Sequence, residues 1–202
     1  MLSTEKLLDK FEAEYGGLCP GQLLGVRLAA LGCKLIGIED PAEFDKKNLI
    51  VWIEIDRWLA DSVEAVTGVR LGKRNMKFLD YGKLAATFLN LETGKAVRVV
   101  ALESSRQLAD KRHPEIESKY LRQMTSYREA TDEELFGIRT VDLELNALDA
   151  PGHPSSRVIC SVCREGVNDG REVITENDVI LCQPCAKSAE KALKAAAAVE
   201  IF

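Results

Sequence analysis

The sequence predicts an α+β core domain with a mixed or antiparallel sheet, followed by a small cysteine-rich domain. Helical and strand-like segments alternate irregularly over residues 2–145, four of the six cysteines lie after residue 159, and a stretch rich in Pro, Gly and Ser separates the two regions. We therefore predict a core domain over residues 1–149, a linker over 150–157, and a four-cysteine domain over 158–202.

Two helices are predicted at the start of the chain. In residues 2–14 the apolar side chains recur at helical spacing. Residues 15–21 contain paired glycines and a Pro-Gly step, which favour a turn and place Cys19 directly before the next helix. Over residues 22–36 apolar side chains cover most of the helical surface, so we expect this helix to be buried on more than one side, with Cys33 in the core.

The rest of the core domain mixes strands and helices. Runs of β-branched and aromatic residues predict strands over residues 48–55, 76–79, 84–91, 96–102 and 138–145. Helical spacing predicts helices over residues 59–67, 103–112 and 115–129. Gly68 is expected to end the first of these helices, and a turn containing Gly94 to join two strands into a hairpin.

Composition and charge limit the function. The formal net charge of -5 argues against binding a phosphate backbone, because such proteins usually present a basic excess. No apolar run approaches the roughly 20 residues that span a bilayer, and the first residues lack the apolar core of a secretory signal. We expect a cytoplasmic protein without a membrane partner or a nucleic-acid partner.

The strongest chemical signal is the pattern C-x2-C-x18-C-x2-C. It is formed by four cysteines: Cys160, Cys163, Cys182 and Cys185. This spacing is typical of a four-thiolate zinc site, and a closed shell of four ligands predicts a structural ion, one per chain, with no open position for catalysis. The alternatives are two disulfides, four unrelated thiols or an iron site, and reducing conditions disfavour the disulfides.

The segments around these cysteines predict a treble-clef or zinc-ribbon-like module. Strands are expected at 173–174 and 179–181 with a turn at 177–178, followed by a terminal helix over 186–200 that begins near Cys185. So small a module needs a metal, because metal binding can supply much of its folding free energy.

Two segments of the core domain carry distinctive motifs. The first is residues 18–27, which read Leu-Cys-Pro-Gly-Gln-Leu-Leu-Gly-Val-Arg. The second is residues 61–88, which hold Thr67-Gly68, Leu71-Gly72-Lys73, Asn75 and Asp80-Tyr81-Gly82-Lys83. In their residues and their order, these segments resemble the FmdE-like family of formylmethanofuran dehydrogenase proteins. With the trailing zinc finger that many members carry, the resemblance covers most of the chain.

The resemblance implies an intertwined homodimer of α+β cores, with a metal or substrate pocket lined by Cys19. In the formylmethanofuran dehydrogenase complexes that give the family its name, other subunits carry the molybdenum or tungsten pterin chemistry. The resemblance therefore also implies a protein partner in a molybdenum or tungsten enzyme system.

This sequence departs from the family pattern at the expected metal ligands. Where members commonly have His-Gly-His it has Tyr15-Gly16-Gly17, and Trp58 and Val69 stand at positions that align with family cysteines. Tyrosine, glycine and tryptophan cannot replace two imidazoles and a thiolate around a transition ion. We therefore predict that the N-terminal metal site is lost or remodelled, with no second metal at Cys19.

Six residues are candidates to line the remaining ligand pocket: Tyr15, Cys19, Trp58, Lys73, Asn75 and Tyr81. Cys19 is either a reactive thiol, because a helix N-terminus favours the thiolate, or a buried inert one. Trp58 and Tyr81 are expected mainly to pack against the protein.

Three basic residues, Lys73, Arg74 and Lys77, flank Gly72, so this turn either holds an anion or is simply solvated. His113 and His153 each adjoin a proline and lack a ligand partner nearby in sequence, so we expect no catalytic role for them.

The predicted function is a metal-binding accessory or ligand-binding protein, a homodimer with a structural zinc finger and a degenerate N-terminal metal site. An enzyme is the less favoured interpretation. The first alternative is an enzyme or redox protein that uses Cys19 in a pocket at the dimer interface. The second is a nucleic-acid-binding or transcriptional zinc module.

Overall fold

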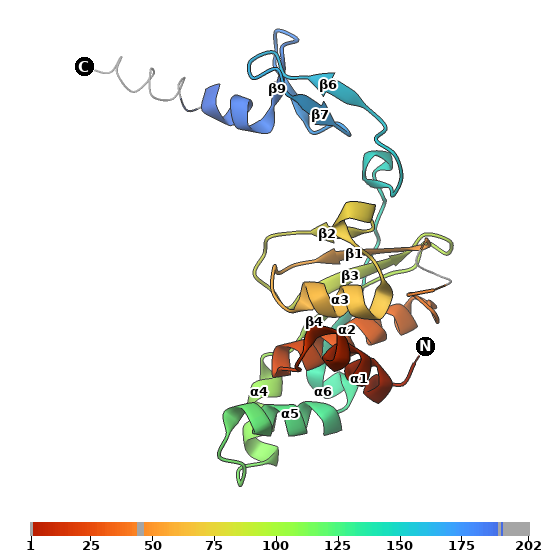
Figure 1. Cartoon of the computed structure of the whole chain (residues 1–202), viewed down its shortest axis with the longest axis vertical. Helices are drawn as coiled ribbons and strands as arrows, with labels where there is room; N and C mark the ends of the chain where they lie inside the picture. The colour runs from red at the N-terminus through yellow and green to blue at the C-terminus, as the bar shows by residue number, and fades with distance from the viewer. Residues whose placement is uncertain (1, 44–46, 190, 192–202) are drawn as a thin grey trace, which may run out of the picture. The chain divides into compact units, whose positions relative to one another are not determined.

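The computed structural model describes residues 2–43, 47–189 and 191 and divides the chain into two units, Met1–Glu144 and Leu145–Phe202 (Figure 1). The division falls ahead of the linker predicted at 150–157. Within that stretch, the Ser155 backbone N–H donates to Asp169 Oδ1 at 2.8 Å, and the Asp169 N–H donates to the Ser156 carbonyl at 3.0 Å. Residues 155 and 156 are therefore bonded into the second unit.

The first unit is built on a mixed five-stranded sheet. Its strands lie in the order β2 (Met76–Phe78), β1 (Leu49–Ile53), β3 (Ala85–Asn90), β4 (Ala96–Ala101) and β5 (Phe136–Thr140). β1 and β2 are parallel and the other pairs are antiparallel. The prediction of an α+β core with a mixed or antiparallel sheet is confirmed.

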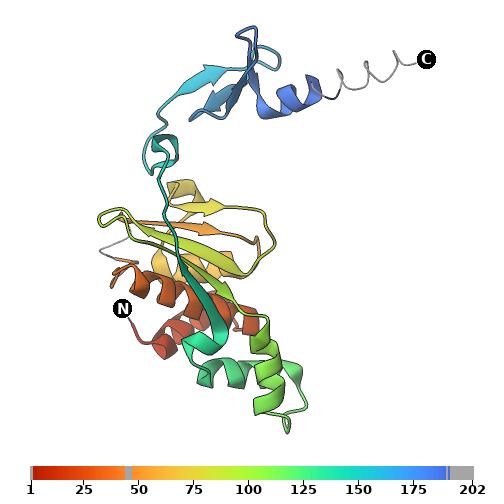
Figure 2. The ribbon, with the colours of Figure 1, turned by 180° about the vertical axis from the view of Figure 1, so that it is seen from behind.

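Helices cover one face of this sheet, as both ribbon views show (Figures 1 and 2). They are α1 (Thr4–Tyr15), α2 (Pro20–Leu35) and α3 (Leu59–Thr67). Side chains alternate along a strand, so Val51 and Phe88 join the core beneath these helices, whereas Arg98 lies on the opposite face. There the Arg98 guanidinium donates two hydrogen bonds, at 2.6 and 2.7 Å, to the buried carboxylate of Glu54.

α2 is the central helix and is buried on several sides, as its sequence predicted. Cys33 is fully buried in it, as expected. Gly32 allows α2 to approach the sheet closely, because a Cβ there would lie less than 3.0 Å from three ring carbons of Phe88. Arg27 ties the helix to the end of the first unit: its guanidinium donates to the carbonyls of Tyr127 and Ala130 at 2.6 and 2.7 Å.

Three helices complete the first unit: α4 (Ser104–Arg112), α5 (Lys119–Glu129) and α6 (Asp132–Leu135). α5 begins at Lys119, later than the predicted residue 115: residues 114 and 115 form a turn and residues 116–118 are irregular. α6 was not predicted; it is a single turn whose start carries a capping box between Thr131 and Glu134.

The last strand of the sheet also differs from its prediction. β5 pairs with β4 from Phe136 to Thr140, whereas the alternating pattern predicted 138–145. Beyond Thr140, only the Val141 N–H reaches β4, donating to the Ala96 carbonyl at 3.2 Å. The alternation continues past residue 140, but β4 offers no further residues to pair with.

The second unit contains two short antiparallel hairpins and the start of a helix. β6 (Arg157–Ile159) pairs with β7 (Gly166–Asn168), and β8 (Glu172–Ile174) pairs with β9 (Ile180–Cys182). The first hairpin was not predicted. Helix follows over residues 183–189, so it begins before Cys185, and most of the helix predicted at 186–200 lies outside the described residues.

This unit has a very small core, consistent with the predicted zinc-ribbon-like module. Its buried cluster consists of Cys160, Leu181 and Ala186, with Cys182 and Cys185 packed against it. Among the residues described in either unit, no helix is long and apolar enough to span a membrane.

Candidate functional site

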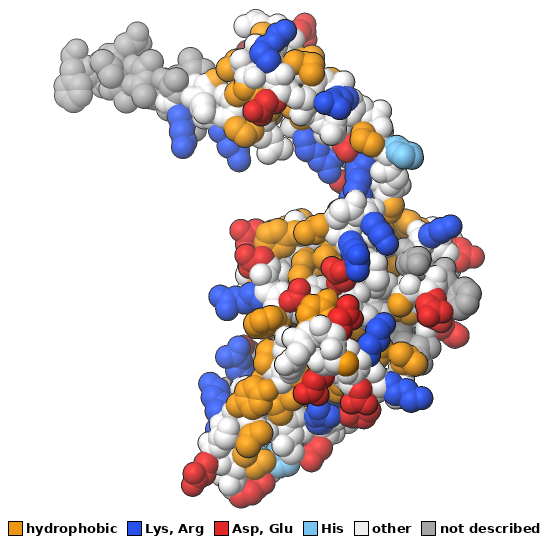
Figure 3. Space-filling view, in the orientation of Figure 1, with side chains coloured by type: hydrophobic (Ala, Val, Ile, Leu, Met, Phe, Trp, Pro, Cys, Tyr) orange, Lys and Arg blue, Asp and Glu red, His pale blue; other side chains and the backbone are white. Residues whose placement is uncertain are grey.

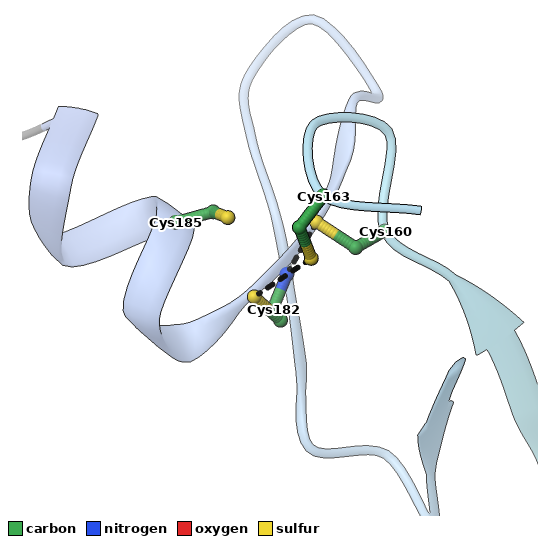
Figure 4. A group of neighbouring side chains, drawn as sticks. All are labelled: Cys160, Cys163, Cys182 and Cys185. Carbon is green, nitrogen blue, oxygen red and sulfur yellow. Dashed lines mark hydrogen bonds between the residues drawn. The ribbon is translucent and has the colours of Figure 1, made fainter. Parts of the chain in front are cut away.

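The four cysteines of the second unit converge on one point (Figure 4). Their Sγ atoms all lie within 4.8 Å of one another. Four thiolates around one zinc ion, at about 2.3 Å each, would place neighbouring sulfurs about 3.8 Å apart. The Sγ atoms of Cys163 and Cys182 are 3.8 Å apart, and all four thiols are free, so the arrangement can hold a metal ion and is not a pair of disulfides.

Backbone hydrogen bonds shape the first cysteine turn. The Cys160 N–H donates to the Glu165 carbonyl at 2.9 Å, and the Arg164 N–H donates to the Cys160 carbonyl at 3.0 Å. Arg164 adopts a left-handed conformation, φ 67°, which closes the turn. The Ser161 N–H donates to the Ile180 carbonyl at 2.8 Å and so holds this turn beside the strand that leads to Cys182.

The sulfurs differ in their tendency to ionise. The pKa of Cys160 is lowered to about 6, first because the Cys182 backbone N–H donates to its sulfur, at 3.3 Å, and second because the Cys163 N–H also donates. The pKa of Cys185 is raised to about 12, first by a hydrogen bond with the Cys182 thiol and then by burial. Four thiolates this close would repel one another, and a divalent metal ion bound among them would supply the balancing positive charge.

Cys19 does not belong to a comparable cluster. Among the residues that the structure describes, the four cysteines of the second unit are the only group of three or more His, Cys, Asp or Glu residues whose ligand atoms converge. Cys19 is the N-cap of α2, and its backbone N–H donates to Gln22 Oε1 at 2.6 Å while its sulfur accepts from the Gln22 N–H. Its thiol is partly exposed rather than fully buried.

An exposed tryptophan lies next to Cys19. A Cβ on Gly21 would be 3.8 Å from the Cys19 sulfur and 3.9 Å from Trp58 Cδ1, so this glycine separates the thiol from the indole. Trp58 precedes α3 and is 54% exposed. The expectation that Trp58 mainly packs against the protein is therefore wrong, because more than half of the residue is open to solvent; Val69, by contrast, is fully buried.

A hollow of about 390 Å³ opens beside Trp58, and its other lining residues are Asp56, Arg57, Ala60 and Asp61. Figure 3 shows acidic and hydrophobic side chains next to one another over the face formed by α1 and α3. Asp56, Arg57 and Asp61 were not predicted as site residues, because charged residues near a turn usually have no role beyond solvation and only the cavity distinguishes these three.

Tyr15 lies at the end of α1, with its ring stacked on Phe11 at a centroid distance of 4.4 Å. Its pKa is raised, first by burial and then by the negative charges of Glu14, Glu64 and Asp61. The acidic potential around the hollow therefore extends to Tyr15.

The other three pocket candidates lie around β2. Lys73 and Asn75 precede this strand, and the Asn75 side chain accepts a hydrogen bond from the Arg70 N–H at 2.8 Å. Tyr81 follows the strand and is 61% exposed, so the expectation that it packs is also wrong. Of the six candidates, only Trp58 lines the 390 Å³ hollow.

The two histidines also have defined positions. His113 Nε2 lies 2.9 Å from Glu129 Oε2, and Nδ1 lies 3.3 Å from Glu115 Oε1, so this ring bridges the loop after α4 to the end of α5. His113 thus does have a partner nearby in sequence, Glu115, and a distant one, Glu129, and both contacts are structural. His153 is exposed in the segment after η2 (Ala147–Asp149).

Comparison with known proteins identifies the first unit. A family described as "FmdE, Molybdenum formylmethanofuran dehydrogenase operon" matches residues 15–144. The chain belongs to the FmdE family. The resemblance inferred from the Cys-Pro-Gly segment and the central block is therefore confirmed.

Two relatives of this FmdE-family chain differ in what they share with it. A "Probable S-adenosyl-L-methionine-binding protein" of Archaeoglobus fulgidus is 30% identical over 118 residues, which is 57% of this chain and 32% of the relative, so the chain spans about a third of that protein's length. A tungsten formylmethanofuran dehydrogenase FmdE-like protein of Syntrophus aciditrophicus, known from its crystal structure, has a TM-score of 0.59 and 24% identity, over 92% of each chain. The second likeness shows a shared fold.

Proposed function

We propose that this FmdE-family protein is a metal-binding accessory protein whose C-terminal unit holds one structural zinc ion. The observation that supports the proposal is the convergence of four sulfur atoms within 4.8 Å of one another. Four protein ligands fill a tetrahedral shell, so the ion would organise the unit rather than activate water. Thiolate ligation needs reduced cysteines, which fits a cytoplasmic location.

The first unit would contribute binding rather than metal chemistry. Positions 15 and 58 carry aromatic side chains, position 69 is a buried valine, and Cys19 has no converging ligands among the described residues. These features support a degenerate metal site that has become a pocket for another ligand. The family resemblance supports a homodimer and a protein partner in a molybdenum or tungsten enzyme system.

Metal analysis of the purified protein tests the proposal. Inductively coupled plasma mass spectrometry should find one zinc per chain in the wild type and in Cys19→Ser. Cys163→Ser should lose most of it, because three thiolates leave the shell open. A wild-type protein without metal, or a second metal that Cys19→Ser removes, would contradict this assignment. Light scattering of the same samples measures the molecular mass, which should be that of a dimer.

A redox or enzymatic role for Cys19 is the second candidate. Its support is a partly exposed thiol at the N-terminus of a 16-residue helix, beside the ring of Trp58. Iodoacetamide should alkylate Cys19 in the folded, zinc-loaded protein much faster than it alkylates the buried Cys33. Equal protection of both thiols until unfolding would remove this candidate.

A further inference from the structure

We propose that the hollow beside Trp58 binds a small organic cation, an ammonium or sulfonium compound, against the indole ring of this residue. The inference rests on the proposed function, because it names a ligand class for the binding role proposed for the first unit.

The size of the hollow suits a small molecule. Its volume of about 390 Å³ lies within the range of roughly 300–1,000 Å³ that is usual for small-molecule sites and is far larger than a bare metal ion. One wall is the side chain of Trp58, which is 54% exposed. Indole is the aromatic surface that attracts cations most strongly, because its π face carries negative potential.

The charges around the hollow favour a positive ligand. The carboxylates of Asp56 and Asp61 line it, and neither makes a hydrogen bond or ion pair in the part of the chain that the structure describes. Arg57 supplies the single opposing charge, so two carboxylates against one guanidinium leave the lining acidic. An anionic ligand would meet net repulsion here.

The negative potential is not confined to the hollow. Asp61, together with Glu64 and Glu14, acts on Tyr15 and raises the pKa of its phenol, after the larger effect of burial. Glu64 is paired with Arg70 at 2.8 Å. Asp61 both lines the hollow and contributes to the raised pKa of Tyr15.

A metal ion fits this site less well than an organic cation. Within the described residues, Asp56, Asp61 and Cys19 do not bring three ligand atoms together. An organic cation needs no such convergence, since it gains from contact with the ring face and from carboxylates at longer range.

Titration with tetramethylammonium chloride at constant ionic strength tests the proposal. Neopentyl alcohol has nearly the same shape without the charge and serves as the neutral control ligand. The chain contains two tryptophans, so a ¹H–¹⁵N spectrum shows two indole signals, and Trp58→Phe identifies the signal of Trp58. We expect a saturable shift of the Trp58 signal with the cation, no saturable shift with the alcohol, and little change at Trp52.

Two variants separate the role of Asp61 from general surface charge. Asp61→Asn should weaken tetramethylammonium binding several-fold. Glu117→Gln, which removes an exposed carboxylate from the loop before α5, should leave it unchanged. Equal responses to the two ligands, or equal affinities of the two variants, would overturn the proposal.

Metal analysis of the same samples distinguishes this inference from the proposed function. One zinc per chain without a selective response to tetramethylammonium would leave the accessory-protein proposal standing and refute only the cation site. Absence of zinc would refute the proposed zinc site whatever the indole signal does.

Discussion

Gly32→Ala tests the close packing of α2 against the sheet. Alanine is favoured over glycine in a helix by about 0.8–1.0 kcal/mol, so an unobstructed site would be stabilised. Here the new methyl group would lie less than 3.0 Å from three carbons of the Phe88 ring, which is fully buried and cannot swing into solvent. Overpacking of this kind typically costs about 1–3 kcal/mol, and we place this site in the upper half of the range.

The two effects oppose each other, and the clash is the larger. We expect Gly32→Ala to lower the free energy of unfolding by about 1–2 kcal/mol, equivalent to a Tm lower by about 2–8 °C for a chain of this size. Both tryptophans lie in the first unit, so their fluorescence during urea unfolding reports on that unit alone. α2 also carries Cys19 at its N-terminus, so the same displacement would disturb the pocket region.

Gly21→Ala is the matched control on the same helix. Its new methyl group would lie 3.8 Å or more from its neighbours, which is ordinary van der Waals contact, so its unfolding midpoint should be no lower than that of the wild type and can rise with the better helix propensity of alanine. The double variant Gly32→Ala/Phe88→Leu should recover part of the loss expected from adding the two single effects. A Gly32→Ala protein as stable as the wild type, or more stable, would refute the packing argument.

Three further predictions concern the hydrogen bonds of Arg27 and the cysteines of the second unit. Arg27→Gln should lower the free energy of unfolding by about 2–4 kcal/mol in the same fluorescence assay, because it leaves two backbone carbonyls and the Asp132 carboxylate without their charged donor. A strong chelator should release one zinc per chain and expose residues 157–189 to proteases, with the tryptophan unfolding midpoint unchanged. The pKa of Cys160 is lowered to about 6 by hydrogen bonds that exist only in the folded unit, so in chelated, unfolded protein the thiolate absorbance at 240 nm should titrate near the ordinary thiol pKa of about 9, with no component near pH 6. A lowered pKa means that ionised Cys160 stabilises the fold fully above the ordinary thiol pKa of about 9, and that this contribution is lost as the pH falls through 6.

Much of the fold could be predicted from local pattern. α3 begins at Leu59 and ends at Thr67 as predicted, because Gly68 adopts the left-handed conformation, φ 69°, that ends a helix. The β3–β4 hairpin also followed from its glycine-containing turn, where Gly94 has φ 72°. The end of β5 could not be predicted, because it depends on where β4 stops offering partners.

The candidate sites also differ in how far the sequence could predict them. Cysteine spacing alone predicted the four sulfurs that converge, since each C-x2-C turn brings two ligands together and a hairpin returns the second pair. The six pocket candidates were grouped by resemblance, and the structure places them at different positions: Trp58 lines the hollow, whereas Asn75 is bonded to the backbone of Arg70.

The sequence by itself determined the family, the type of each main element and the four-cysteine cluster, because all of these depend on residue types at short, regular spacing. Only the tertiary structure decided that Trp58 is exposed, that Gly21 separates it from Cys19, and that Asp56 and Asp61 share a hollow with it. Those relations arise where the end of β1, the start of α3 and the start of α2 meet in space. Spacing along the chain does not encode that meeting, because it is set by how the helices pack on the sheet.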